Sequence, residues 1–286
     1  AEWKKVSTEQ LYLSKGSDEF ISQIIMACCG PATDHIVIVP PTFGMYKVAA
    51  RTYGVAVREV PLDADFQLDA EAVLEATDDH SKIIFIPTPN NPTANSFDVQ
   101  ALKKIIQEFP GLVVVDEAYI EFTDQASFIE LLDSHSNLVV CQTFSKAQGM
   151  AGARLGMAFA HHELIRYLNR IKAPYNINSL TLAAALQRLE EQDQVQEQVA
   201  FMLEERKRLE AAFAEIGFIK TIFPSDANFV LVRVDDSSLR YQQLLDSGIV
   251  VRNPSKNTAC ENTLRISVGL TEENNALIRA LRTLDT

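Results

Sequence analysis

The sequence predicts an α/β protein: a mostly parallel central sheet sandwiched by helices, followed by a smaller α+β C-terminal domain. Between residues 35 and 160, short apolar runs rich in β-branched residues alternate with amphipathic stretches. After residue 178 the pattern changes to a long helical stretch. The chain has 286 residues, 47% of them hydrophobic, which suits one large or two moderate domains.

The runs expected to form the central sheet are HIVIVP, GVAVREVP, KIIFIPTP, LVVVDEAY, NLVVCQTF and RLGMAFA. Between them, DAEAVLEATD and DVQALKKIIQEF carry apolar residues at helical spacing. Another helix is expected just after Gly16, where Ser17 or Asp18 is a natural N-cap. Parallel strands collect functional groups where strands end and loops begin.

The C-terminal part predicts one long or slightly broken helix over residues 179–216. Two strands follow, FVLVRV and LRISVG, and each precedes a helical pattern. We therefore expect a large domain over residues 1–200 and a small domain over residues 201–286.

Composition narrows the class of partner. The net charge is -12, which disfavours a nucleic-acid backbone or an anionic membrane, although a local arginine cluster still allows a small anionic substrate. Four cysteines lack framework spacing and predict reduced thiols in a cytoplasmic protein. No apolar run reaches membrane-spanning length, and the histidines lack metal-ligand spacing.

Three motifs carry polar groups at strand ends or helix starts, and each has a purely structural explanation. Asp116 ends the run LVVVD, with Tyr119 shortly after it, and a salt bridge or helix cap would explain the acid equally well. Asn91 lies in the loop PTPNNPTANS, which also fits a plain turn. The segment Gly16-Ser17-Asp18 precedes a helix, where free amides can bind phosphate or simply be capped.

A lysine stands in the most informative stretch, QTFSKAQGMAGARLG. Lys146 follows Thr143 and Ser145, and Arg154 lies beyond a glycine-containing turn. A lysine can bond covalently to a carbonyl, while hydroxyls and an arginine can bind a phosphate. Together with Asp116, Tyr119 and Asn91, these groups meet the needs of a pyridoxal phosphate site.

The motifs GSDEFI, PPTFGMY, PNNPT, VVDEAYIEF, TFSKAQGMAGARLG and VVRNPSKNTACENTLRISVG occur in this order over nearly the whole chain. On these motifs the chain resembles the fold-type I pyridoxal-phosphate-dependent aminotransferases, and among them the histidinol-phosphate branch. The resemblance implies the cofactor pyridoxal 5'-phosphate and a homodimer.

The resemblance also implies catalytic roles for Lys146, Asp116 and Tyr119. Lys146 would bond to the cofactor and move a proton, and Asp116 would hold the pyridine nitrogen protonated. Tyr119 and Asn91 would contact the ring oxygen, and Phe43, where the family usually has tyrosine, would stack on the ring. The residues implied at the cofactor phosphate are Ser17, Asp18, Ser145 and Arg154, with Thr143 nearby.

For the substrates, the resemblance implies a site made by Arg265, Arg252 and Asn91. Arg265 would clamp the carboxylate of glutamate or 2-oxoglutarate, and both arginines would grip the phosphate of histidinol phosphate. The expected activity is amino transfer between L-histidinol phosphate and 2-oxoglutarate in histidine biosynthesis. Alternatives are an aromatic amino-acid transaminase, a phospho-amino-acid decarboxylase on the same scaffold, or an inactive truncated fragment.

Besides Phe43, the sequence departs from the family pattern at three places. The family's N-terminal arm is expected before GSDE, so the chain reads as truncated. Ala94 stands where the family has glycine, and Gln148 replaces an apolar residue after the lysine.

Overall fold

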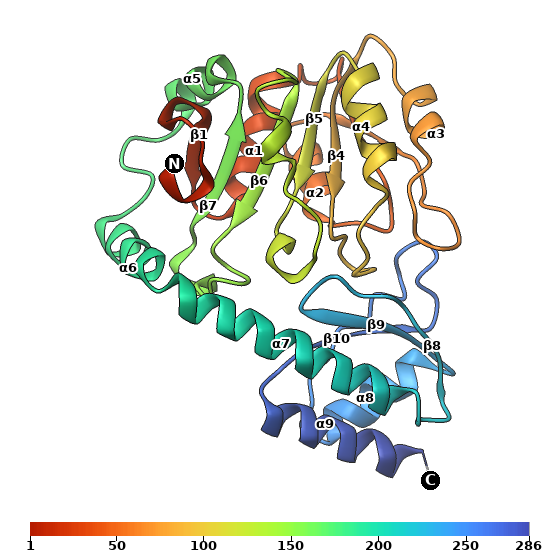
Figure 1. Ribbon diagram of the computed structural model, residues 1–286. Helices are drawn as coiled ribbons and strands as arrows, with labels where there is room; N and C mark the ends of the chain where they lie inside the picture. Colours follow the sequence, from red (N-terminus) through yellow and green to blue (C-terminus); the bar gives the residue numbers. More distant parts are fainter. Residues whose placement is uncertain (286) are drawn as a thin grey trace.

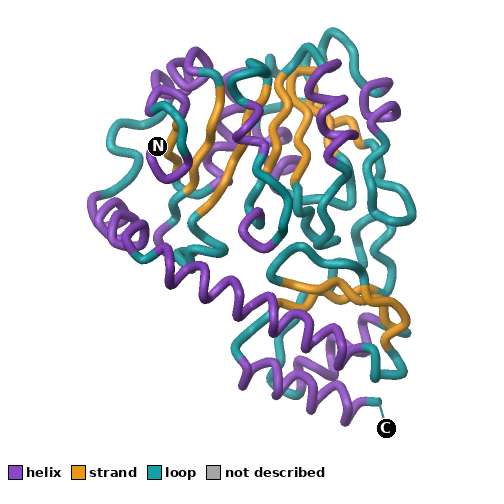
Figure 2. Tube along the Cα trace, viewed as in Figure 1, coloured by secondary structure: helices purple, strands orange, loops and turns teal. Residues whose placement is uncertain are grey.

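The computed structural model describes residues 1–285 and contains two β-sheets with helices packed around them (Figures 1 and 2). The larger sheet confirms the predicted α/β class. In spatial order its strands are β1 (Leu11–Ser14), β7 (Gly156–Ala160), β6 (Leu138–Thr143), β5 (Leu112–Asp116), β4 (Ser81–Pro87), β2 (His35–Ile38) and β3 (Ala56–Glu59). Strands β3, β2, β4, β5 and β6 run parallel, and β7 runs antiparallel to both neighbours.

The central strands are buried on both faces. One face packs on α1 (Ser17–Cys28), α2 (Met45–Thr52) and α5 (His162–Ile171), and the other on α3 (Ala70–Glu75) and α4 (Val99–Glu108). Successive residues of one strand join different cores: Phe85 packs with the first set of helices and Ile84 with the second. This two-sided burial explains why the strands read as continuous apolar runs.

The N-cap predicted for the first helix was wrong. Helix α1 begins at Ser17, and its N-cap is Gly16, which has φ 75° and no side chain to cap with. Ser17 therefore already lies inside the helix, and the Asp18 carboxylate pairs with Arg154 instead. The first amides of α1 are left without a side-chain cap.

Of the two alternatives predicted for the long helical stretch, the structure shows the broken one. It forms α6 (Ser179–Glu190) and α7 (Gln192–Phe213), which are separated at Glu191. Helix α7 runs from beside the larger sheet to the smaller one (Figure 1). The expected boundary at residue 200 falls inside α7, and the division into two domains stays a prediction.

The smaller sheet is antiparallel, in the order β10 (Thr263–Ser267), β9 (Phe229–Val234) and β8 (Ile219–Ile222). It packs on α8 (Ser237–Asp246) and α9 (Thr271–Leu284). Strand β8 was not predicted. The short 3-10 helices are Glu2–Lys4, Thr8–Gln10, Ile120–Phe122, Phe128–Leu131 and Ala151–Ala153.

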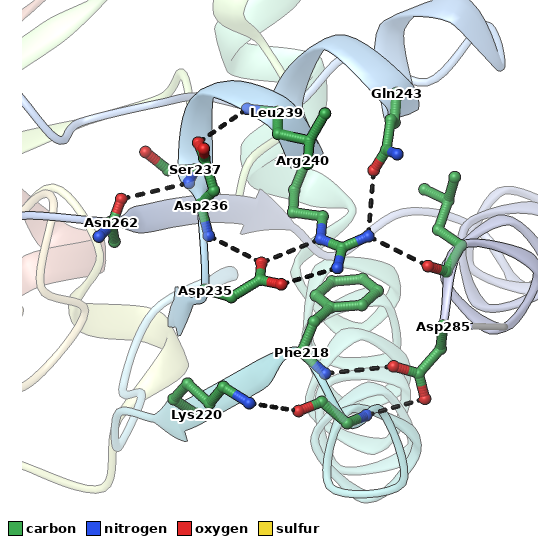
Figure 3. A network of polar contacts seen from close by, with 12 residues as sticks. Phe218, Lys220, Asp235, Asp236, Ser237, Leu239, Arg240, Gln243, Asn262 and Asp285 are labelled. Carbon is green, nitrogen blue, oxygen red and sulfur yellow. Dashed lines mark hydrogen bonds and ion pairs between the residues drawn. The ribbon is translucent and has the colours of Figure 1, made fainter.

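An arginine ties this smaller unit together (Figure 3). The Arg240 guanidinium donates to both carboxylate oxygens of Asp235, at 2.9 and 2.7 Å, and to the Leu284 carbonyl at 3.0 Å. It also lies 3.9 Å from the centre of the Phe218 ring. Helix α8 is thereby joined to the end of β9 and to the end of α9.

A buried apolar cluster connects the two sheets. Tyr119 and Phe122 follow β5, and they pack with Ala227 and with Phe229 at the start of β9. This contact sets β9 and β10 beside the loops that follow the parallel strands. Within residues 1–285, no helix is long and apolar enough to cross a membrane, and no group of three or more His, Cys, Asp or Glu side chains could hold a metal ion.

Candidate active site

The ends of β4, β5 and β6 surround a cavity of about 260 Å³. This is the edge at which parallel sheets usually bind ligands. Every residue predicted to hold the cofactor lines the cavity, together with one arginine predicted for the substrate. These residues are Ser17, Asp18, Phe43, Asn91, Asp116, Tyr119, Thr143, Ser145, Lys146, Arg154 and Arg265.

Asp116 supplies a buried carboxylate to the cavity. Its side chain is nearly inaccessible (4% exposed), and it forms no ion pair within the described chain. The Tyr46 hydroxyl donates to Oδ2 at 2.7 Å, and the Ala118 amide donates to Oδ1 at 3.2 Å. Burial raises the pKa of Asp116, and hydrogen bonds from Tyr46, Cys141 and Ala118 act against that rise. A salt bridge therefore does not account for this acid.

Lys146 lies in the turn that follows β6. Its Nζ atom is 5.1 Å from the centre of the Tyr119 ring. Tyr119 is itself held by an edge-on contact with Phe229, with the ring centres 5.3 Å apart. The turn is tied back by the Ser145 amide, which donates to Thr143 Oγ1 at 3.1 Å, and by the Gly149 amide, which donates to the Lys146 carbonyl at 2.9 Å. These hydrogen bonds fix the backbone of the turn from which the Lys146 side chain projects.

The start of α1 forms one side of the cavity and contributes free backbone amides. The same cavity is lined by the hydroxyls of Thr143 and Ser145, whose oxygens are 3.0 Å apart, and by the Arg154 guanidinium. Arg154 Nη2 donates to Asp18 Oδ2 at 3.2 Å. Helix N-terminal amides, hydroxyls and a guanidinium together form a donor set that suits a phosphate dianion.

Two glycines allow the start of α1, Arg154 and β7 to approach one another closely around this donor set. A Cβ atom on Gly16 would lie 2.6 Å from Arg154 Nη2, and one on Gly156 would lie 2.6 Å from the Ser17 amide nitrogen. Side chains at these positions would fill the space between β7, Arg154 and the helix start. The donor set and this close approach fit the phosphate of pyridoxal phosphate.

A second cavity, of about 440 Å³, adjoins the first and shares Phe43, Asn91 and Arg265 with it. Arg252 lines only the second cavity, with Tyr241 and Asn257 among its other walls. Arg265 therefore stands between the two spaces.

The two arginines are paired through their backbones. The Arg252 amide donates to the Arg265 carbonyl at 3.0 Å, and the Arg265 amide donates to the Arg252 carbonyl at 2.8 Å. Opposed residues of an antiparallel bridge project their side chains to the same face. Both guanidinium groups therefore leave the sheet on one side.

The Arg265 guanidinium has hydrogen-bond donors that the described chain leaves unsatisfied. Its Nη1 atom donates to Asn91 Oδ1 at 2.5 Å, and its guanidinium lies 4.8 Å from the centre of the Phe229 ring. Its Nε atom is buried and has no hydrogen-bond partner in the described chain. Burial lowers the pKa of Arg265, because the charge is partly removed from water. A buried cation with an unsatisfied donor is suited to an anionic ligand.

Two side chains that hydrogen-bond to Asp116, those of Tyr46 and Cys141, were not identified from the sequence. Tyr46 lies within the motif PPTFGMY, and Cys141 is the register partner of Asp116 on β6. Tyr46 belongs to a motif that the sequence analysis quoted, but no role was expected for it. Its hydrogen-bond acceptor, Asp116, lies 70 positions away in the sequence. Only the fold brings the two together.

Ala94 and Gln148, two of the positions that depart from the family pattern, have distinct surroundings. Ala94 is fully buried and has φ 70°, a backbone region that favours glycine. Gln148 is 2% exposed, and its side chain exchanges hydrogen bonds with Gln192 at 3.2 and 3.4 Å. Gln148 thus has a polar partner on α7.

Comparisons with known proteins agree with this geometry. Residues 1–281 match the family described as aminotransferase class I and II. The histidinol-phosphate aminotransferase of Flavobacterium johnsoniae is 45% identical over 276 residues, which cover 96% of this chain and 79% of the relative. That of Parabacteroides distasonis is 46% identical over 281 residues, covering 98% and 81%.

Solved structures give the same result. The histidinol-phosphate aminotransferase from Clostridium acetobutylicum is similar with a TM-score of 0.92 and 27% identity, covering 99% of this chain and 86% of that one. The enzyme from Sinorhizobium meliloti, solved in complex with pyridoxal-5'-phosphate, gives a TM-score of 0.91 and 26% identity, covering 99% and 80%. L-threonine-O-3-phosphate decarboxylase from Porphyromonas gingivalis, 21% identical with a TM-score of 0.84 and covering 99% and 86%, shares the fold alone.

Proposed function

The chain belongs to the class I and II aminotransferases, and from this premise we propose that it transfers an amino group between L-histidinol phosphate and 2-oxoglutarate, with glutamate as the other amino compound. It is a pyridoxal-phosphate-dependent enzyme. The observation that carries the choice of substrate is the backbone-paired Arg252 and Arg265 beside the cofactor cavity.

When bound, pyridoxal phosphate supplies a carbonyl for covalent attachment and a ring that withdraws electrons from the substrate. In our proposal Lys146 holds it covalently, and Asp116 faces its ring nitrogen. Tyr119 and Asn91 face the ring oxygen, and Phe43 covers one face of the ring. The phosphate is held by the amides of Ser17 and Asp18 and by the side chains of Ser145 and Arg154, with Thr143 nearby.

Lys146 also moves the reacting proton. Once the substrate's amino group has displaced Lys146 from the cofactor, the released amine would take the proton from the substrate's Cα and give it back later in the reaction. Asp116, as a carboxylate, favours the charged pyridine nitrogen that makes this proton removable. Asp116 ends β5 and Lys146 lies in a hydrogen-bonded turn after β6, so the backbones of both residues are positioned before any substrate binds.

The substrate part of the proposal rests on the position of the two arginines. Arg265 lines both cavities and can reach an anion on either substrate, while Arg252 lines only the outer one. A phosphate presents more acceptor oxygens than a carboxylate, so it can engage both guanidinium groups. An aromatic amino acid would leave Arg252 without an anion.

A half-reaction tests the proposed function directly. The cofactor-loaded protein is mixed with histidinol phosphate, phenylalanine or a phosphorylated amino acid, and the absorbance of the cofactor is followed. We expect a fast change with histidinol phosphate and a reversal with 2-oxoglutarate. Preference for phenylalanine would contradict the substrate assignment, and release of carbon dioxide would indicate a decarboxylase.

Borohydride reduction tests the covalent assignment. Reduction of the loaded protein should fix the cofactor on Lys146, as read by peptide mass spectrometry. Label on any other lysine would contradict the assigned role of Lys146.

The proposal includes a cytoplasmic homodimer with a large domain over residues 1–200 and a small domain over residues 201–286. Four free cysteines are consistent with a reducing compartment. The exposed apolar side chains of α6 support a second copy of the chain as a partner.

A further inference from the structure

Tyr46 occupies a position that the proposed chemistry does not yet use. It lies on α2, is fully buried, and donates its hydroxyl hydrogen to Asp116 Oδ2 at 2.7 Å. The hydroxyl therefore acts on the buried acid of the cavity.

The Tyr46 ring is held by two aromatic neighbours. It stacks on Phe85 of β4, with ring centres 4.7 Å apart and planes at 15°. It also meets Phe43 edge-on, at 5.6 Å and 85°. Tyr46 thus contacts both Asp116 and Phe43, the residues assigned to the nitrogen and to the face of the cofactor ring. A ring fixed on two sides cannot swing its hydroxyl away without disturbing the core.

We propose that Tyr46 is a positioning residue, whose hydroxyl keeps the Asp116 carboxylate ionised and oriented toward the ring nitrogen. The inference rests on the proposed function, since it concerns the same cofactor site. No bond to the cofactor is assigned to Tyr46 itself.

The electrostatics of the pair agree with this assignment. Burial raises the pKa of Asp116 and so favours the neutral acid, which could not stabilise a charged ring nitrogen. The donated hydrogen bond from Tyr46 opposes the rise, as do the Cys141 thiol and the Ala118 amide, while the charge of Asp18 adds to it. Burial and the nearby Asp116 raise the pKa of Tyr46 well above its usual value, so the hydroxyl remains a donor.

The simpler explanation is a buried tyrosine whose hydroxyl merely needs a partner. Tyr12 provides a matched comparison, because it is equally buried, belongs to the same core and donates to Gln23 Oε1 at 2.5 Å. Its hydroxyl does not reach the cavity. Tyr12→Phe therefore removes a buried tyrosine hydrogen bond to a neutral acceptor without touching Asp116.

The test is a double-mutant cycle on Tyr46→Phe and Asp116→Asn, with Tyr12→Phe as the control. Two quantities are measured: the affinity of the apoprotein for pyridoxal phosphate, and the rate of the half-reaction at saturating amino donor. Losing a hydrogen bond to a charged group should weaken cofactor binding and slow the half-reaction by about ten- to a hundredfold in Tyr46→Phe. The KM for the amino donor should change little.

The Asp116→Asn background makes the result decisive. There, Tyr46→Phe should have almost no further effect on either quantity, because the charge it serves is already gone. An equal loss in both backgrounds, or an equal loss in Tyr12→Phe, would overturn the inference. Cofactor affinity does not depend on which amino donor is used, so this readout still judges Tyr46 if histidinol phosphate proves not to be a substrate.

Folding provides a second measurement. If Tyr46→Phe is too unstable to assay, the cycle is read from the unfolding midpoints of the apoproteins. In Tyr46→Phe, the buried Asp116 must either keep its charge without the Tyr46 donor or take up a proton. Asp116→Asn removes that cost, so the double variant should be more stable than Tyr46→Phe alone. A double variant that is no more stable would contradict the inference.

Discussion

At the scale of single residues, Gly156 shows how one missing methyl group can shape the cavity. A Cβ atom there would lie 2.5 Å from the Gly16 carbonyl carbon and 2.6 Å from the Ser17 nitrogen, and both are backbone atoms. Gly156→Ala must therefore push the start of α1 away from β7. We expect a stability loss of roughly 1–3 kcal/mol, as for an overpacked core, and weaker cofactor binding.

Gly152 offers the matched control for this change, because a Cβ atom at that position would meet nothing within 4 Å. Gly152→Ala should leave both thermal stability and cofactor affinity close to those of the parent. Equal effects of the two substitutions on cofactor affinity would show that the close approach of β7 and α1 does not build the phosphate site.

The two arginines allow a prediction about substrate choice. Arg265 lines both cavities and Arg252 only the outer one, so Arg252→Ala should harm histidinol phosphate more than glutamate. Arg265→Ala should harm both. Losing a charge-assisted contact costs about 1.5–3 kcal/mol in transition-state binding. The measurement is kcat/KM for each substrate, and equal losses for both substrates in Arg252→Ala would contradict a phosphate role.

At the scale of elements, the contact between α8 and the end of β9 should be sensitive to acid. Hydrogen bonds from Arg240 lower the pKa of Asp235 to about 2 from a usual value of 3.8. The folded state therefore gains stability from the ionised form above pH 3.8, and it loses that gain as the pH falls toward about 2.

Asp235→Asn should remove this dependence. Its unfolding free energy should vary less between pH 4 and pH 2 than that of the parent, as measured by denaturant titration across this range. Asp124→Asn, at an exposed position, should behave like the parent. An unchanged pH profile in Asp235→Asn would mean that the Arg240 contact contributes nothing to stability.

The sheet could be predicted because its central strands are continuous and apolar. Runs such as VVV before Asp116 identify strands buried on both faces. Strand β8, with the letters IKTI, escaped prediction because it is a partly exposed edge strand with little apolar signal. The prediction placed the N-cap of α1 at the wrong residue. The N-cap is Gly16, where the absence of a side chain lets Arg154 lie close to the backbone, and no side chain caps the helix.

The residues of the candidate site were predictable because they lie in motifs, and the structure gathers them in one cavity. The hydrogen-bond partners that hold these residues in place could not be predicted from the sequence. Tyr46 reaches Asp116 across 70 positions, and Gln148 finds its partner Gln192 on another element. Such pairs follow from tertiary packing, which has no local signature in a single sequence.

At the scale of the whole molecule, α6 is incompletely covered. Only Thr181 and Ala185 of this helix are buried, whereas Leu180 is 82% and Leu186 64% exposed. Tyr175, just before the helix, is 98% exposed. Large apolar side chains exposed along one short segment are typical of an interaction surface.

We therefore expect a homodimer that buries α6 at a two-fold interface. Light scattering should give twice the 31.8 kDa mass of one chain. Leu180→Asp combined with Leu186→Asp should shift the protein to a monomer, because two charges would have to be buried without partners. Leu239→Asp, which changes a half-exposed leucine of α8, is the control and should leave the mass unchanged, since this leucine lies on the smaller unit and away from α6. If the parent is a monomer, or if the double variant remains a dimer, α6 is not a dimer interface.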